Sequence, residues 1–183
     1  MRIRLTFLLL ALLLVPGLAY ADAHKMDYFL GGSGGDGGSG IGGAHASINW
    51  GTKIPWLDVV GPDFSVQFGG HQGKSLTQVA YQGGLHFTLT SMKKPYKDMP
   101  VKPFAHFMAG GVYTNDSTGK AFKDGAFSFG FGVEQFFKKD ATQTDHFSGV
   151  GYRVQYDYII RSGDRESFSR VSAGIVYRLL KTH

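Results

Sequence analysis

A strict alternation of side-chain character in the last third of the chain limits what this sequence can fold into. From Tyr152 to Ile160, every second residue is apolar or aromatic. The residues between them are mostly polar or charged and include Arg153 and Asp157. A period of two is that of a β-strand with one apolar and one polar face. The segment 152–161 is therefore predicted to be a strand.

The same alternation recurs along most of the chain. Val171 to Leu179 supply an apolar face opposite Arg170 and Arg178, and the polar segment 161–167 predicts a hairpin turn. No segment of helical period separates the apolar runs, which excludes βαβ units. The segment 102–114 is apolar on both faces, so its phase stays open. Eight strands are predicted: 25–31, 41–50, 57–69, 78–90, 102–114, 125–138, 147–161 and 168–180.

The N-terminus has the pattern of a secretory signal. A basic start is followed by an apolar run from Leu5 to Val15 and by the small-x-small sequence Ala19-Tyr20-Ala21. This run is shorter than the ~20 residues of a spanning helix, and its ending suits a signal peptidase. We expect residues 1–21 to be cleaved, which leaves one β-barrel domain over 22–183.

The fold class that fits is an all-β, eight-stranded antiparallel up-and-down transmembrane barrel. Only helices and closed barrels satisfy every backbone polar group in lipid, and most predicted strands reach the ~9–11 residues of a tilted crossing. An even strand number places both termini at one end, which is expected to be periplasmic. The external loops are then expected at 32–40, 70–77, 115–124 and 162–167, with lengths similar to those of the connections at the other end.

Alternation alone does not say which face points outward. A soluble lipocalin-like barrel that binds apolar ligands would turn its apolar face inward, and this alternative stays open. However, many Phe and Tyr side chains would crowd the interior of an eight-stranded barrel. Placed outside, they would meet lipid, with aromatic girdles near the strand ends. The candidates for these girdles are Trp50, Trp56, Tyr96, Tyr152 and Tyr177.

With the apolar face outside, the charged residues of the other face would line the lumen. Glu134 and Asp157 could pair there with Arg153, Arg170 and Arg178. An arginine at the bilayer midplane would instead cost roughly 2–4 kcal/mol. Since side chains fill an eight-stranded barrel, this network is expected to be structural, and open-channel activity is not expected.

Composition excludes several other function classes. The chain has no cysteine, so disulfides, zinc–thiolate sites and thiol nucleophiles are excluded. The net charge of +5 falls to +3 without Arg2 and Arg4, and no basic stripe remains, so nucleic acid is not an expected partner. The scattered histidines His45, His86 and His106 are expected to make structural polar contacts, and no metal or cofactor is expected.

Several segments resemble the OmpA-like outer-membrane β-barrel proteins of Gram-negative bacteria. They are Pro103 to His106 with Ala109 to Gly111, Phe129 to Val133, Tyr152 to Tyr158 and Arg170 to Leu179. The resemblance implies a monomeric eight-stranded barrel in the cell outer membrane, here without a peptidoglycan-binding domain. It also implies contact with outer-membrane lipid and with the assembly machinery. The family usually ends on an aromatic residue, where this chain has Leu179 and a further Leu180 to His183.

A structural or surface-interaction role is therefore expected, and no enzyme activity. The alternative is a lipid-modifying outer-membrane enzyme, because His146 and Ser148 resemble the His-x-Ser pair of lipid A deacylases. That family carries a glutamate twelve residues beyond the serine, where this chain has Ile160. The glycine run from Gly31 to Gly40 is expected to be a flexible external loop, and the loops carry no signature of a particular partner.

Overall fold

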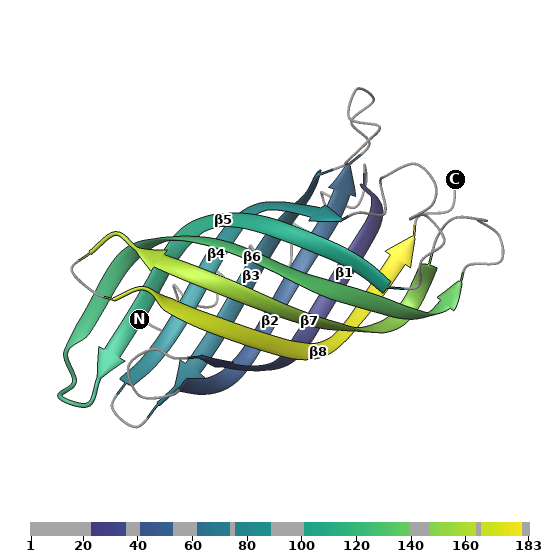
Figure 1. Cartoon of the computed structure of the whole chain (residues 1–183). Helices are drawn as coiled ribbons and strands as arrows, with labels where there is room; N and C mark the ends of the chain where they lie inside the picture. Colours follow the sequence, from purple (N-terminus) through teal and green to yellow (C-terminus); the bar gives the residue numbers. More distant parts are fainter. Residues whose placement is uncertain are drawn as a thin grey trace, which may run out of the picture.

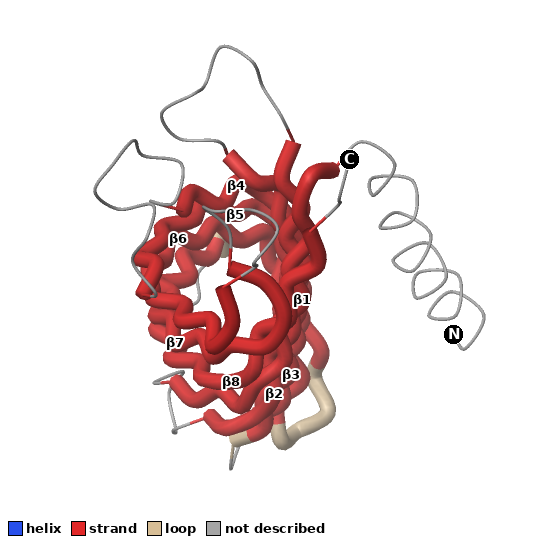
Figure 2. The backbone as a smooth tube through the Cα atoms, turned by 90° about the vertical axis from the view of Figure 1, so that its right-hand side faces the viewer, coloured by secondary structure: helices blue, strands red, loops and turns tan. Residues whose placement is uncertain are grey.

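Alternating side chains build eight antiparallel strands, and these strands close into one barrel (Figures 1 and 2). The computed structural model describes residues 23–35, 41–52, 62–73, 76–88, 101–139, 147–163 and 166–180. The strands are β1 (Ala23–Gly35), β2 (Ile41–Thr52), β3 (Pro62–Gln72), β4 (Leu76–Thr88), β5 (Val101–Asp116), β6 (Ala121–Lys139), β7 (Phe147–Arg161) and β8 (Phe168–Leu180). The predicted fold class, with eight antiparallel strands, is confirmed.

Each strand pairs with its neighbours in sequence, and β1 pairs with β8 to close the barrel. The strands are staggered as well as closed. A path of paired residues that leaves β8 at Arg178 crosses to Asp27, circles the barrel once and returns to β8 at Phe168. Such a stagger accompanies the strand tilt of a barrel, and closure leaves no unpaired edge.

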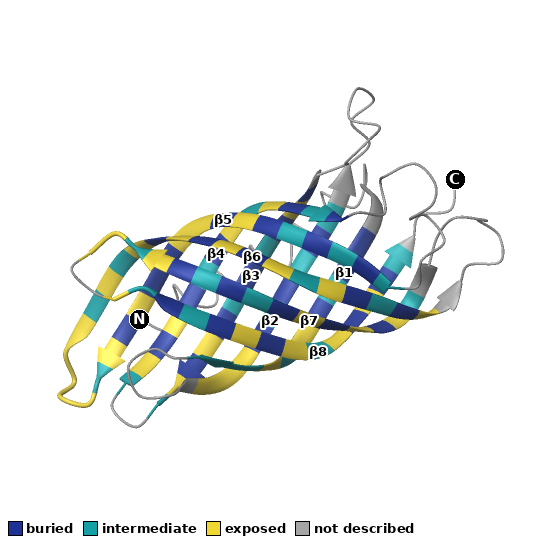
Figure 3. Ribbon diagram, in the orientation of Figure 1, coloured by how far each residue is buried: buried dark blue, intermediate teal, exposed yellow. Residues whose placement is uncertain are grey.

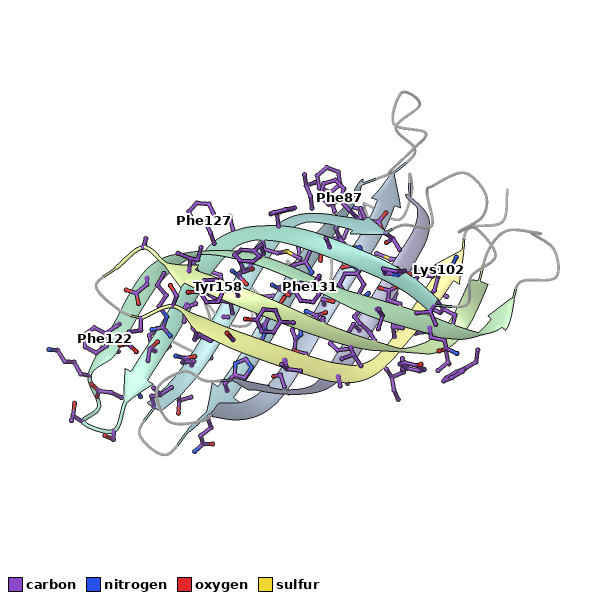
Figure 4. All side chains as sticks on the ribbon, in the orientation of Figure 1. Phe87, Lys102, Phe122, Phe127, Phe131 and Tyr158 are labelled. Carbon is purple, nitrogen blue, oxygen red and sulfur yellow. The ribbon has the colours of Figure 1, made fainter. Side chains whose placement is uncertain are left out.

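The two faces of each strand differ in burial, as the banded ribbons of Figure 3 show. On β6, Phe127, Phe129 and Phe131 are exposed, whereas Ser128 and Glu134 are buried. Side chains such as those of Phe87 and Phe127 project away from the barrel (Figure 4). The apolar face therefore points outward and the polar face inward, as the sequence predicts for the membrane barrel.

The structure shows which residues of β5 point inward, a question that the sequence leaves open. Lys102, Phe104, His106 and Met108 are buried inside, and Phe107 lies exposed outside. Among the residues that the structure describes, no helix could span a bilayer, a finding that does not bear on crossing by strands.

Three of the five predicted girdle residues lie on the outer face. Tyr152 and Tyr177 are exposed, and Trp50 stacks on Phe64 with ring centroids 6.2 Å apart. Tyr177 also pairs across the β1–β8 seam with a second outward tyrosine, Tyr28. The other two predicted girdle residues, Trp56 and Tyr96, lie outside the described residues.

The glycine run begins as strand rather than loop, which corrects the predicted loop 32–40. β1 continues to Gly35, and Gly31 to Gly35 pair with β2 on one side and β8 on the other. Pairing on both sides satisfies the backbone groups, and this outweighs the low strand propensity of glycine.

Other loops at the same end are also shorter than predicted. β3 and β4 extend through most of 70–77, and β5 and β6 reduce 115–124 to a turn at 117–120. β7 and β8 begin and end at the predicted residues. Residues 181–183 lie outside the described residues. The residues between the strands at the other end, 53–61, 89–100 and 140–146, lie outside the described residues, so the predicted similarity in loop length is not tested.

Two inward glycines allow β4 and β5 to approach closely. A Cβ added at Gly84 would meet the backbone oxygen of Phe107, and one added at Gly110 would meet that of Tyr81. Glycine at such positions permits the tight curvature of a narrow barrel. Part of the glycine surplus in the sequence therefore has a specific steric role.

Candidate functional site

The five charged residues predicted for the lumen all lie inside the barrel and are almost completely buried. They are Glu134 on β6, Arg153 and Asp157 on β7, and Arg170 and Arg178 on β8. Alternation places each of them on the inner face of its strand. The structure brings them together in two clusters, one around Glu134 and one around Asp157.

Glu134 joins two arginines in the first cluster. Its Oε1 accepts a hydrogen bond from Arg153 Nη2 at 2.5 Å, and its Oε2 accepts one from Arg178 Nη2 at 3.1 Å. Arg153 Nη1 also donates to Ser47 Oγ on β2. The Glu134 carboxylate therefore joins the neighbouring strands β6, β7 and β8, and Arg153 extends this contact across the lumen to β2.

Asp27 completes the first cluster, and sequence reasoning missed it. Its two carboxylate oxygens accept hydrogen bonds from Arg178 Nε and Nη2, each 2.6 Å long. Asp27 lies on β1, whose predicted segment is short and runs directly into glycines. The signal that could have revealed it is the period of two, which places Asp27 and Phe29 on one face.

Aromatic rings surround the arginines of this cluster. The Arg153 guanidinium carbon lies 5.1 Å from the ring centroid of Phe29 and 5.2 Å from that of Phe104. The guanidinium of Arg178 lies 4.1 Å from the Phe136 ring. The sequence does not indicate these inward rings. Gly132 leaves room for one of them, because an added Cβ there would lie 2.6 Å from Phe104 Cζ.

Asp157 is the centre of the second cluster. Arg170 Nε donates to its Oδ2 at 2.8 Å, and His106 Nε2 lies 2.5 Å from its Oδ1. Gln155 Nε2 donates to the same carboxylate at 3.1 Å. Gly130 makes this arrangement possible, since a Cβ there would lie 2.6 Å from Asp157 Oδ1.

Amides extend the second cluster to the opposite wall of the barrel. Gln67 Oε1 accepts from Arg170 Nη2 at 3.1 Å, and Gln67 Nε2 donates to Gln82 Oε1 at 2.9 Å. Ser128 donates to the same Gln82 oxygen at 3.1 Å. Buried charges are stable only when they are paired and hydrogen-bonded. Here the partners come from strands all around the lumen, so the two clusters link these strands.

Comparison with solved structures identifies barrels of the same architecture. Neisserial surface protein A has a TM-score of 0.55 at 12% identity, covering 84% of this chain and 95% of that chain. Ail, the attachment invasion locus protein of Yersinia pestis, has a TM-score of 0.51 at 10% identity, covering 86% and 99%. The N-terminal β-barrel domain of Pseudomonas aeruginosa OprF has a TM-score of 0.53 at 9% identity, covering 86% and 98%.

This chain has the fold of the small eight-stranded outer-membrane β-barrels. The resemblance to OmpA-like barrels is therefore confirmed at the level of the fold. No protein-family model matches the sequence, and no curated protein matches it either. At such low sequence identities, the structural similarity shows the fold and does not indicate a particular activity.

The three histidines named in the sequence all lie inside this outer-membrane fold. His45 lies within hydrogen-bonding distance of Ser172 Oγ, at 3.1 Å, and of Gln67 Oε1, at 3.0 Å. The rings of His86 and His106 have centroids 6.3 Å apart. Among the described residues, no group of His, Asp and Glu side chains is arranged to hold a metal ion.

The candidate enzyme residues do not form a site among the described residues. His146 lies outside them, as does the side chain of Ser148. Ile160, at the position where lipid A deacylases carry a glutamate, is exposed on the outer face of β7. An alkyl side chain cannot orient a histidine, so this position offers no third member of a catalytic triad.

Proposed function

We propose that this protein is an outer-membrane barrel with a structural or surface-interaction role and a lumen filled by side chains. The observation that carries the proposal is that the apolar face of the strands points outward and the charged face points into the lumen. Large apolar side chains such as Phe127, Phe131 and Ile175 are at least 60% exposed, whereas the charged residues of both clusters are buried. Water would make such an outer surface costly, and lipid would not.

A soluble lipocalin-like barrel would have the opposite arrangement, with an apolar lumen. Dependence on detergent therefore tests the proposal against this alternative. The purified protein should stay monomeric only in detergent or lipid, and it should shift in gel mobility between unheated and heated samples. A protein that remains monomeric in buffer alone would contradict the membrane assignment.

The filled lumen argues against a permanent open channel. Beyond the Asp157 cluster, Ile159, Val112 and Phe168 form an apolar layer inside the barrel. Ions would have to cross this layer as well as both charged clusters. Planar-bilayer recordings should show little or no conductance, and large, steady openings would contradict this part of the proposal.

The fold and the predicted signal peptide, residues 1–21, both support a location in the outer membrane. We infer that the mature chain crosses the periplasm, is inserted by the outer-membrane assembly machinery and works as a monomer. The turn at 117–120 would then face the outside. Because the chain has no cysteine, Ser117→Cys provides a single label site. On intact cells it should react with a membrane-impermeant maleimide, whereas the buried Ser128→Cys should not.

Lipid-modifying activity is not part of the proposed function. Lipid A incubated with the purified protein should keep all of its acyl chains, as measured by mass spectrometry. Loss of an acyl chain that disappears in His146→Ala would show that the protein is an enzyme after all.

A further inference from the structure

Two buried histidines, His45 on β2 and His71 on β3, lie beside Arg170 inside the barrel. Gln67 Oε1 lies 3.1 Å from Arg170 Nη2 and 3.0 Å from His45 Nε2, so the guanidinium and the first ring share one acceptor. An added Cβ at Gly69 would lie 2.5 Å from Arg170 Nη1 and 2.8 Å from His71 Cε1. The guanidinium and the second ring therefore pack against the same glycine. Both rings lie next to a buried positive charge.

The hydrogen bonds of His45 suit its neutral form. Arg170 has only N–H donors, so the Gln67 atom that it contacts is the acceptor oxygen. His45 Nε2 must then donate to that oxygen as well. The Ser172 hydroxyl lies 3.1 Å from His45 Nδ1 and can donate to this nitrogen. A neutral ring with its proton on Nε2 thus has a partner for each nitrogen.

His71 has no acceptor for a second proton among the described residues. Its Nε2 lies 2.7 Å from Ser33 Oγ, whereas its Nδ1 is buried without a hydrogen-bond partner there. If Nε2 donates to Ser33, a proton added at Nδ1 would be a buried donor that nothing accepts. Burying a charge without a hydrogen-bonded counter-charge is costly. His71 is therefore also suited to be neutral.

Asp157 is the carboxylate of this cluster, and it already has two partners. It accepts a hydrogen bond from Arg170 Nε at 2.8 Å, and its Oδ1 lies 2.5 Å from His106 Nε2. Both of these contacts come from strands other than those of the two histidines, β8 and β5. The carboxylate that neutralises Arg170 therefore makes no hydrogen bond to His45 or His71.

The other charge near His45 is also positive. The Phe29 ring centroid lies 5.3 Å from that of His45 and 5.1 Å from the guanidinium carbon of Arg153. Arg153 belongs to the first cluster, where Glu134 neutralises it. The remaining side chains around the two histidines are uncharged, and they are Ser33 on β1, Gln67 on β3, Gln78 on β4 and Ser172 on β8.

We propose that His45 and His71 form a proton-sensitive switch for the Asp157 cluster. While both rings are neutral, Arg170 stays bound to Asp157 and Gln67, and this part of the lumen remains packed. Protonation of either ring puts a second positive charge beside the buried guanidinium, and like charges repel strongly away from water. The cluster then loosens, and the barrel becomes less stable in acid.

The test compares the full mature protein with the H45Q/H71Q variant in detergent micelles at pH 7.5 and pH 5. An unfolded histidine binds a proton near pH ~6.5, so each ring that stays neutral in the folded barrel favours unfolding at pH 5 by up to about thirtyfold. Urea titration gives the unfolding equilibrium constant. Its rise on acidification should be larger in the wild type than in the variant, by up to about a thousandfold for the two rings.

The comparison isolates the two histidines because every other titrating group, including His86 and His106, is present in both proteins. Ser128→Ala is the matched control, since it removes a hydrogen bond of the same cluster but no titrating group. It should respond to pH as the wild type does. Equal responses of the wild type and H45Q/H71Q would overturn the proposal. The gel shift between unheated and heated samples shows whether each protein has folded.

If H45Q/H71Q does not fold, nitrogen NMR of the wild-type imidazole rings in micelles decides. At pH 6 an exposed histidine is mostly charged, because its ordinary pKa is about 6.5. His45 and His71 should both keep the spectrum of a neutral ring at this pH. A charged ring at either position in the folded barrel would contradict the proposal.

Discussion

Asp27 and Arg178 join the first and last strands of the barrel through two hydrogen bonds, each 2.6 Å long. Their Cα atoms are direct partners in the β1–β8 register, so this ion pair lies on the seam that closes the barrel. Both side chains are buried, so each charge needs the other as its partner away from water. The pair therefore stabilises closure itself.

Replacement of Asp27 by Ala should destabilise the barrel. Removal of one partner from a buried ion pair typically lowers the free energy of unfolding by about 3–5 kcal/mol. The lower end is expected here because Arg178 still donates a hydrogen bond to Glu134. Urea unfolding in detergent micelles, followed by tryptophan fluorescence, measures the effect. The matched control is Glu166→Gln at an exposed position, which should change stability by less than about 0.5 kcal/mol. Equal stability of Asp27→Ala and the wild type would show that the pair has no role in closure.

Replacement of Asp157 by Ala should also weaken the fold, because Arg170 would keep its charge in a buried site. The expected loss is about 3–5 kcal/mol. Asp157→Asn keeps the shape of the side chain and one acceptor oxygen, so it should lose less stability than Asp157→Ala. The ordering of the three proteins in urea midpoint tests this account. An Asn variant less stable than the Ala variant would contradict it.

Gly84 and Gly42 should differ in their tolerance of alanine. At Gly84 an added Cβ meets the backbone of Phe107 and Met108, which cannot move aside cheaply, whereas at Gly42 nothing lies within 4 Å. Gly84→Ala should therefore cost about 1–3 kcal/mol, and Gly42→Ala less than about 0.5 kcal/mol. The recovery of heat-modifiable protein after refolding provides a second measure. Similar losses in both variants would mean that the approach of β4 and β5 is not a steric limit.

An arginine at Phe131 should separate a membrane barrel from a soluble one. Phe131 is exposed on the outer face, so in water the substitution would cost little. In a bilayer an outward arginine near the midplane costs roughly 2–4 kcal/mol. Ser117→Arg, in the exposed turn between β5 and β6, is the control and should be neutral. If unfolding in lipid vesicles shows Phe131→Arg to be as stable as Ser117→Arg, the outer face does not meet lipid.

The residues on each face were predictable wherever large and small side chains alternate cleanly. On β6 to β8 the period of two places Glu134, Arg153 and Arg170 inside, and the structure has them there. This works because the face of a strand residue depends only on local backbone geometry. The phase of β5 could not be predicted in this way, since apolar side chains such as Phe104 and Phe107 occupy both of its faces.

The predicted loops were less accurate because composition is a weak guide to where pairing stops. Gly31 to Gly35 remain in β1 because two neighbouring strands hold their backbone on both sides. A flexible sequence becomes a strand when its partners are fixed, and those partners are distant in the chain. The inward Phe29, Phe104 and Phe136 were also missed, because they fit beside small residues contributed by other strands.

The sequence by itself determined the number of strands, the face of most residues and five of the charges that lie inside. Only the tertiary structure decided which charges meet: Asp27 with Arg178, Glu134 with two arginines, and Asp157 with Arg170 and His106. Alternation is a local property of each strand. The register between strands depends on how the barrel closes and staggers, and that involves the whole chain at once.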